Sequence, residues 1–190
     1  ISELMLQQTR VDQVIPYYRR FLKRFPNLRT LANAPRSDVL KLWEGLGYYS
    51  RAVRAQETAR YLMQHAGGRF PRTLDGLRDL PGIGPYTAAA VGSLAMGLDA
   101  AVVDGNVIRV LARVLACPDE VSKPAVRLYF QQWADALLPA GRAGVFNEAV
   151  MELGATVCTP RQPHCAPCPL RLACSAYQRG CPADYPIKLR

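Results

Sequence analysis

The chain has 190 residues, 49% of them hydrophobic, and a formal net charge of +9 at pH 7. This length is enough to bury a sizeable core, and no apolar run approaches the ~18 residues that a membrane span needs, which argues against a membrane protein. The positive charge favours a polyanionic partner such as nucleic acid, although charge alone does not establish one.

Helical periodicity runs along the chain, and no segment alternates as a strand does, so we predict an all-α fold. Ser2, Ser37, Thr73 and Ser122 are the expected N-caps, and glycines at 45, 47, 67 and 68 are expected helix ends. The predicted helices cover residues 2–8, 11–25 around Pro16, 38–46, 50–66, 74–80, a run after the turn at 81–85, 106–115, 123–138 and 143–158.

A tight turn at residues 81–85 contains two glycines and two prolines and precedes a small, apolar run. Helix, Leu-Pro-Gly-Ile-Gly, helix is a helix-hairpin-helix pattern, in which Gly82 and Gly84 permit positive φ and close approach of the backbone to a ligand. The next helix would offer N–H groups and a positive dipole end to a phosphate, which predicts sequence-independent anchoring on DNA. A plain turn between packed helices fits a lone Pro-Gly-x-Gly equally well.

Five of the six cysteines lie in the last 33 residues. Four of these follow the spacing C-x6-C-x2-C-x5-C: Cys158, Cys165, Cys168 and Cys174. The chain opens on Ile1 without a methionine, which predicts a fragment or trimmed form. The lack of a secretory signal favours a metal or cluster site over disulfides. Zinc sites usually pair two C-x2-C knuckles, so one such pair within four cysteines favours a 4Fe–4S cluster over zinc. Cys117 is expected to be a buried thiol, and Cys181 has no assigned role.

Five segments together resemble the endonuclease III superfamily of DNA glycosylases, and within it the MutY family of adenine DNA glycosylases. They are SELMLQQTRV, LWEGLGYYSRA, LPGIGPYTAAA, VVDGNVIRVLAR and FNEAVMELGA, and with the cysteine loop they span essentially the whole chain. The resemblance implies a six-helix barrel domain over residues 1–98, with the hairpin at 73–97, and a cluster domain over 99–190 that carries an aspartate. It also implies a helix before Ile1 and a C-terminal domain that reads 8-oxoguanine, neither of which this chain contains.

The resemblance implies a monofunctional base-excision-repair enzyme that hydrolyses the N-glycosidic bond of adenine mispaired with 8-oxoguanine or guanine. It assigns Glu3 to protonate the leaving adenine at N7, and Asp104 to stabilise positive charge on the sugar or to add to it covalently. Two carboxylates with separate tasks are also the logic of glycosidases. Asp104 must stay ionised, and Asn106 and the following helix start would supply the donors it needs. Taken alone, Glu3 would be interpreted as a helix-start charge and Asp104 as a helix N-cap, and their placement within the matched motifs reverses this interpretation.

Tyr86 separates two reaction classes. Relatives that also cut the strand carry lysine here, whose amine forms a Schiff base, and tyrosine cannot form that imine. Gln8 resembles the family glutamine that wedges into the base stack, and Tyr48 the tyrosine that intercalates beside 8-oxoguanine. Thr9 and Thr87 are expected DNA contacts beside Gln8 and the hairpin glycines. Both tyrosines also fit a packing role.

The expected partner is double-stranded DNA with an A:8-oxoguanine or A:G mismatch. The protein is expected to bind it as a monomer, and no association with a membrane is expected. The expected location is the cytoplasm or nucleoid of a bacterium, or a eukaryotic nucleus or mitochondrion. The tail after Cys158 predicts a phosphate-facing surface, because Asp184 is its only acidic residue. Its basic residues are Arg161, Arg171, Arg179, Lys188 and Arg190. Two alternatives stay open, a G:T/G:U mismatch or endonuclease III-like pyrimidine glycosylase and a non-catalytic, cluster-bearing DNA-binding module.

Overall fold

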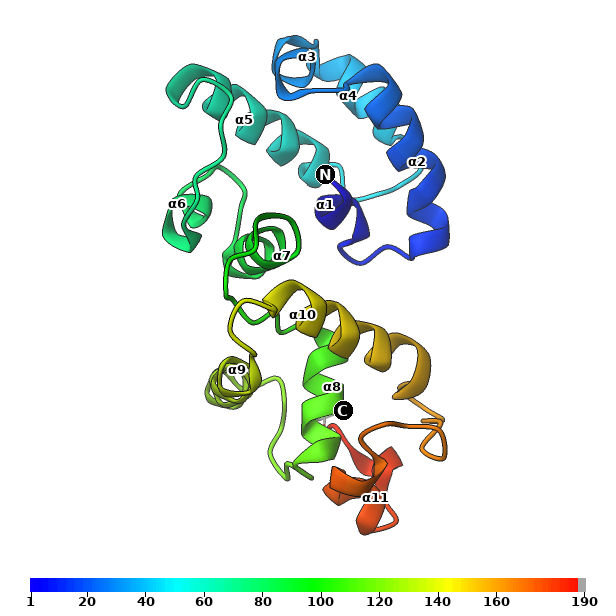
Figure 1. The fold of residues 1–190 in the computed structure, drawn as a ribbon. Coiled ribbons are helices and arrows are strands. Elements are labelled where there is room, and N and C mark those ends of the chain that lie inside the picture. The colour runs from blue at the N-terminus through cyan, green and yellow to red at the C-terminus, as the bar shows by residue number, and fades with distance from the viewer. Residues whose placement is uncertain (188–190) are drawn as a thin grey trace. The chain divides into compact units, whose positions relative to one another are not determined.

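The computed structural model describes residues 1–187, which form helices joined by short connections (Figure 1). Within this range the only β pairing is an isolated bridge between Glu120 and Ile187, so the all-α prediction is confirmed. The chain divides into two compact units, Ile1–Val91 and Gly92–Arg190. None of the described helices is both long and apolar enough to cross a membrane.

Unit 1 contains six complete helices and the start of a seventh. They are α1 (Ser2–Leu6), α2 (Val11–Arg24), α3 (Leu28–Asn33), α4 (Arg36–Trp43), α5 (Ser50–His65), α6 (Leu74–Arg78) and α7 (Pro85–Met96), which runs on into unit 2. α5 packs against α1, α3 and α4. The core of unit 1 is built on fully buried side chains such as Met5, Phe21 and Trp43, and the last two rings meet edge to face at 5.9 Å.

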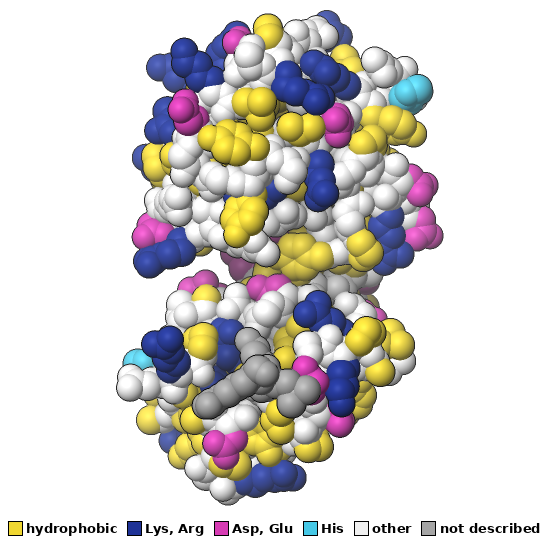
Figure 2. Space-filling model, turned by 180° about the vertical axis from the view of Figure 1, so that it is seen from behind, with side chains coloured by type: hydrophobic (Ala, Val, Ile, Leu, Met, Phe, Trp, Pro, Cys, Tyr) yellow, Lys and Arg dark blue, Asp and Glu magenta, His cyan; other side chains and the backbone are white. Residues whose placement is uncertain are grey.

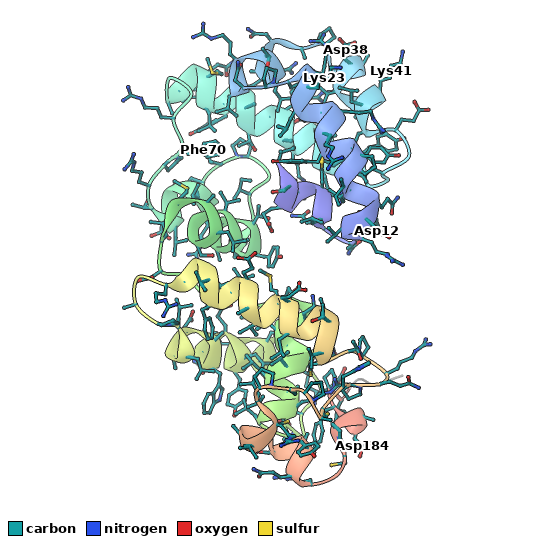
Figure 3. All side chains as sticks on the ribbon, turned by 45° about the vertical axis from the view of Figure 1, so that its right-hand side comes forward. Asp12, Lys23, Asp38, Lys41, Phe70 and Asp184 are labelled. Atoms are coloured by element: carbon teal, nitrogen blue, oxygen red, sulfur yellow. The ribbon has the colours of Figure 1, made fainter. Side chains whose placement is uncertain are left out.

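The amphipathic pattern of α2 explains how unit 1 is assembled. Val14 and Phe21 lie two turns apart on one face and are buried. Asp12 and Lys23 point outward from the same helix (Figure 3). Pro16 lies inside α2, which continues through it as the sequence predicts.

Unit 2 is organised around α8 (Gly105–Val114), which packs against four other helical elements of this unit. Figure 1 shows α8 with α9, α10 and α11 around it. The remaining elements are α9 (Pro124–Leu137), α10 (Ala143–Glu152), a π-helix η1 (Leu153–Val157), two 3-10 turns η2 (Arg171–Ala173) and η3 (Pro182–Asp184), and α11 (Ser175–Gln178). Val107, Leu111 and Phe130 are central to its buried core. Cys117 is buried in this core, as predicted.

Three of the four predicted N-caps are wrong. α1 begins at Ser2 itself and α4 begins at Arg36, so Ser2 and Ser37 lie inside the first turn and make no capping hydrogen bond. α9 begins at Pro124, whose fixed φ and missing N–H suit a first helical position. Ser122 instead donates its hydroxyl to a neighbouring carboxylate.

Other helix ends follow their local chemistry. The Thr73 hydroxyl accepts an N–H from the first turn of α6 at 3.2 Å, which confirms this cap. The Gly67-Gly68 pair has positive φ just after α5, as predicted. The sequence analysis missed α3, which begins with a capping box between Asn27 and Thr30.

Candidate functional site

The turn between α6 and α7 contains two glycines, and only one of them has a backbone conformation that would be strained for other residues. Gly82 has φ +77°, and a Cβ added there would lie 2.6 Å from the Cβ of Arg54. The Thr58 hydroxyl donates to the Pro81 carbonyl at 2.7 Å and fastens the turn to α5. The expected positive φ is wrong for Gly84, where an added Cβ would meet nothing within 4 Å. The Gly84 backbone is therefore open to a close approach.

The first turn of α7 contains both Tyr86 and Thr87, in different surroundings. Tyr86 is 36% exposed, whereas Thr87 is buried. The Gln7 side-chain amide donates to the Thr87 hydroxyl at 3.1 Å, which ties α7 to the segment after α1. A contact between Thr87 and DNA would therefore use its backbone N–H rather than its hydroxyl.

Gln8 and Tyr48 share an unusual backbone conformation close to the ends of helices in unit 1. Their φ angles are +57° and +49°, and Ala116 is the only other non-glycine residue with positive φ in the described range. This conformation costs free energy and concentrates at functional sites. Gln8 is exposed, and Tyr48 is 59% exposed. Glu3 precedes them in α1, half-buried and followed by the buried Leu4.

Asp104 is the N-cap of α8. Its Oδ1 accepts hydrogen bonds from the backbone N–H groups of Asn106 and Val107, both at 2.8 Å, and its Oδ2 accepts one from the Asn106 side-chain amide at 3.0 Å. The expected donors are therefore present. Both oxygens act as acceptors, which suits an ionised carboxylate at the positive end of a helix.

Arg109 fixes the orientation of Asn106. One guanidinium nitrogen, Nη2, donates to Asn106 Oδ1 and to the Gly154 carbonyl, both at 2.7 Å, and Nε donates to the Cys158 carbonyl at 2.7 Å. Burial lowers the pKa of Arg109, and Cys158 opposes that shift most strongly. Because Asn106 Oδ1 is held by Arg109, its amide nitrogen is turned toward Asp104.

The predicted helix over 143–158 is continuous in direction but changes type. After α10 ends, Leu153–Val157 form the π-helix η1, which leads directly to Cys158. Gly154 in this turn lies so close to α8 that an added Cβ would be 2.6 Å from the Cβ of Asn106. π turns are rare in proteins, and those that occur are frequently found at functional sites. Here the turn lies against the start of α8 and leads to Cys158, whose carbonyl accepts from Arg109 and Arg113 farther along the same helix.

The four cysteines predicted to bind a cluster line one cavity in unit 2, together with Arg113 and apolar residues. The pKa of Cys165 is raised, first by burial and then by the three other cysteines, while Arg113 lowers it. Among the described residues, no three His, Cys, Asp or Glu side chains are arranged to hold a metal ion. The four thiols are neighbours around this cavity.

Two buried residues near these groups were missed by the sequence analysis. Arg113 is 1% exposed, and its Nη1 donates to Cys158 Sγ at 3.3 Å. Asn147 is 2% exposed, accepts the Val102 N–H at 3.0 Å and donates to the Ala100 carbonyl at 2.8 Å, which fixes the segment that leads to Asp104. A charged or amide side chain at a core-facing position of a helix is the signal that could have revealed both.

The basic tail is only partly described. Arg161, Arg171 and Arg179 are exposed, while Lys188 and Arg190 lie outside the described residues. Lysine and arginine side chains are visible on both units in Figure 2, interspersed with acidic ones. The phosphate-facing role of the tail stays a prediction.

Comparison with known proteins relates the chain to a family. Residues 1–135 match the family described as HhH-GPD superfamily base excision DNA repair protein. Adenine DNA glycosylases from Mus musculus, Schizosaccharomyces pombe and Buchnera aphidicola subsp. Baizongia pistaciae are 49%, 43% and 40% identical over 94%, 94% and 93% of the chain. The chain spans 35%, 39% and 50% of those proteins.

Solved structures agree on the fold. A thermostable thymine-DNA glycosylase is 32% identical, with a TM-score of 0.82 over 93% of this chain and 82% of that one. Endonuclease III in a non-covalent complex with DNA is 24% identical, with a TM-score of 0.78 over 93% of this chain and 81% of that one.

Proposed function

The chain belongs to the HhH-GPD superfamily of base excision DNA repair proteins, and on this premise we propose that it releases adenine mispaired with 8-oxoguanine or guanine from double-stranded DNA. The observation that carries this proposal is Asp104, a carboxylate held by three N–H donors at the start of α8. The choice of adenine is supported by adenine DNA glycosylases 36–49% identical to this chain.

In the proposed reaction the bond between the sugar C1′ and adenine breaks, and its electron pair leaves with the base. Glu3 protonates the adenine at N7, so that the base departs without a full negative charge. Asp104 opposes the positive charge that develops on the sugar, or adds to C1′ until water displaces it. Water supplies the new hydroxyl at C1′, and the proton it loses restores the acid.

Tyr86 supports a monofunctional reaction. A primary amine is needed to form an imine with C1′, and a phenol in the first turn of α7 cannot supply one. The product would then be an intact abasic site. Strand cleavage would follow only on treatment with alkali.

DNA binding would combine an anchor that ignores sequence with residues that contact bases. The open backbone at Gly84 and the first turn of α7 suit a phosphate, because a helix start offers N–H groups and a positive dipole end. Gln8, Thr9 and Tyr48 would contact the stack near the flipped adenine, and stacking of an aromatic ring on a base contributes ~1–3 kcal/mol. We propose that the protein acts as a monomer, in the compartment that contains the DNA.

The four cysteines support a 4Fe–4S cluster. They line one cavity, and their number and spacing match the thiolate set of such a cluster. Arg113, buried against Cys158 Sγ, would offset part of the negative charge of four thiolates. The cluster would supply a rigid, charged centre on which the loop from Cys158 to Cys174 is ordered.

A second candidate is a mismatch glycosylase that removes thymine. The thymine-DNA glycosylase at 32% identity favours it, since its fold covers 93% of this chain. Single-turnover assays on A:8-oxoguanine, A:G, G:T and thymine-glycol duplexes, each analysed with and without alkali, distinguish the two. The proposal expects release from the first two duplexes alone and strand cuts only after alkali. Faster release from the G:T duplex would overturn it, and binding without release from any duplex would favour the non-catalytic alternative.

A further inference from the structure

α5 begins with a charged side chain at a core position. Arg51 is 4% exposed and lies on the same face of the helix as the buried Ala55 and Ala59. None of the ion pairs among the described residues includes it. Burial lowers the pKa of its guanidinium, and the guanidinium stays charged because the pKa of arginine starts very high.

The guanidinium of Arg51 instead donates to oxygen atoms in the last turn of α1, in the loop after α1 and in the loop after α4. Nη1 donates to the carbonyls of Leu4 (3.0 Å), Met5 (2.7 Å) and Gln7, and Nη2 to the Thr9 hydroxyl (3.1 Å) and the carbonyls of Gly47 (3.1 Å) and Leu46 (3.4 Å). α1 lies beside the N-terminal end of α5, so one side chain reaches both loops (Figure 1).

Each of these loops contains one of the two strained, exposed residues of unit 1. Gln8, with φ +57°, lies between Gln7 and Thr9, both of which accept hydrogen bonds from Arg51. Tyr48, with φ +49°, follows Gly47, and its ring centroid lies 5.2 Å from Cζ of Arg51. A left-handed residue other than glycine persists only where its neighbours over-determine the backbone. Arg51 supplies that constraint through the residues on both sides of Gln8 and through Gly47, the residue before Tyr48.

This burial is a poor arrangement for stability alone. The Arg51 Nε–H has no hydrogen-bond partner among the described residues, and no carboxylate offsets the buried charge. A fork that reaches two loops at once is what only arginine provides, because lysine has a single compact head with three donors. The feature is therefore better explained by geometry imposed on the loops than by stability gained.

We propose that Arg51 is a positioning residue for base recognition, which holds Gln8 and Tyr48 in their left-handed conformations with both side chains directed outward before DNA binds. The proposal rests on the proposed function, in which these two side chains enter the base stack. Pre-organisation of this kind removes the cost of ordering the loops on binding. Its loss affects unstacking of the target base while the hairpin anchor still holds the phosphates.

Arg60 provides a matched control on the same helix. Its guanidinium donates to the backbone carbonyls of Ala32 (3.0 Å) and Ala34 (3.3 Å), which lie at the end of α3. Arg60→Met removes a comparable side chain without touching either loop. Arg51→Met and Arg51→Lys remove the fork, and the lysine variant keeps the charge and guards against loss of folding.

The experiment uses duplexes with the fluorescent adenine analogue 2-aminopurine at the mispaired adenine, and duplexes with no mismatch. Thermal unfolding is measured first, and all proteins are then assayed well below the lowest midpoint. Binding to the matched duplex should stay within about twofold of the parent for every variant, since the anchor is unchanged. The preference for the mismatched duplex should fall by about 5- to 150-fold in both Arg51 variants, the range of one lost base-stacking contact, and the rise in fluorescence should disappear. Arg60→Met should keep both.

Normal unstacking by Arg51→Met, full rescue by Arg51→Lys, or an equal loss in Arg60→Met would each overturn the positioning role. The same experiments distinguish failure of the positioning role from failure of the proposed function. A parent protein that unstacks the analogue in an Arg51-dependent way but never releases adenine keeps the positioning role and refutes the glycosylase. A parent that releases adenine while Arg51→Met unstacks normally does the reverse.

Discussion

Asp104→Asn separates the two roles that the structure gives to Asp104, because asparagine caps a helix about as well as aspartate does. Its single carbonyl oxygen can still accept the backbone N–H groups of Asn106 and Val107, which both donate to Oδ1 in the parent. The other oxygen becomes an NH2 group that faces the Asn106 amide nitrogen, and Asn106 cannot turn over because Arg109 holds its Oδ1. One hydrogen bond is therefore lost.

The magnitudes of the two effects differ widely. The lost hydrogen bond should lower the free energy of unfolding by about 0.5–1.5 kcal/mol, whereas Asp104→Ala, which loses the cap, should cost about 0.5–2 kcal/mol. Removal of the charge that opposes the sugar cation should slow base release at least ~10²- to 10³-fold, the usual effect of deleting a preorganised electrostatic group.

The assay compares single-turnover adenine release and thermal unfolding for the parent, Asp104→Asn and Asp99→Asn. Asp99 is the matched control, since it is an exposed acid of unit 2 whose two oxygens accept the Gly141 N–H at 3.0 Å. Asp99→Asn should release adenine at the parent rate. Release by Asp104→Asn within tenfold of the parent, or a slowing that merely tracks lost stability, would refute the electrostatic role of Asp104.

Three further predictions concern binding, the cofactor and the reaction class. Gly84→Ala should weaken binding to matched and mismatched duplexes alike, and flatten the salt dependence, without changing thermal unfolding, whereas Gly82→Ala should also lower the unfolding midpoint because of its φ of +77° and the contact with Arg54. A change confined to mismatched DNA would contradict the anchor. Purified protein should be brown with about four irons per chain, and Cys165→Ser should lower the iron content; stoichiometric zinc without iron would contradict the cluster. Borohydride should trap little covalent adduct with Tyr86 in place, and adduct formed at the rate of base release would contradict the monofunctional assignment.

Local chemistry explains which parts of the fold could be predicted from the sequence. The Thr73 cap and the Gly67-Gly68 end are set by residues within one turn, so pattern and structure agree. Ser37 and Ser122 were mistaken for caps because a proline two residues away determines where each helix begins. The π turn could not be predicted, since it depends on contact between Gly154 and α8, far away in sequence.

The candidate site divides in the same way. The donors to Asp104 come from the next three residues and could be predicted. Arg51 and Arg113 could not, because the partners of Arg51 lie up to 47 positions away and those of Arg113 up to 72. An arginine on the apolar face of a helix is a visible signal, but the groups it joins become known only once the chain is folded.

Release of free adenine from an A:8-oxoguanine duplex by excess protein, measured for the parent and for Glu3→Gln, tests the central claim most directly. Glutamine keeps the shape of Glu3 but cannot protonate the leaving base. The parent should release adenine in a single turnover, and Glu3→Gln should be slower by at least the ~10²- to 10⁴-fold that a positioned acid supplies, with the duplex still bound. No adenine from the parent at saturating protein, or equal rates for the two proteins, would contradict the account.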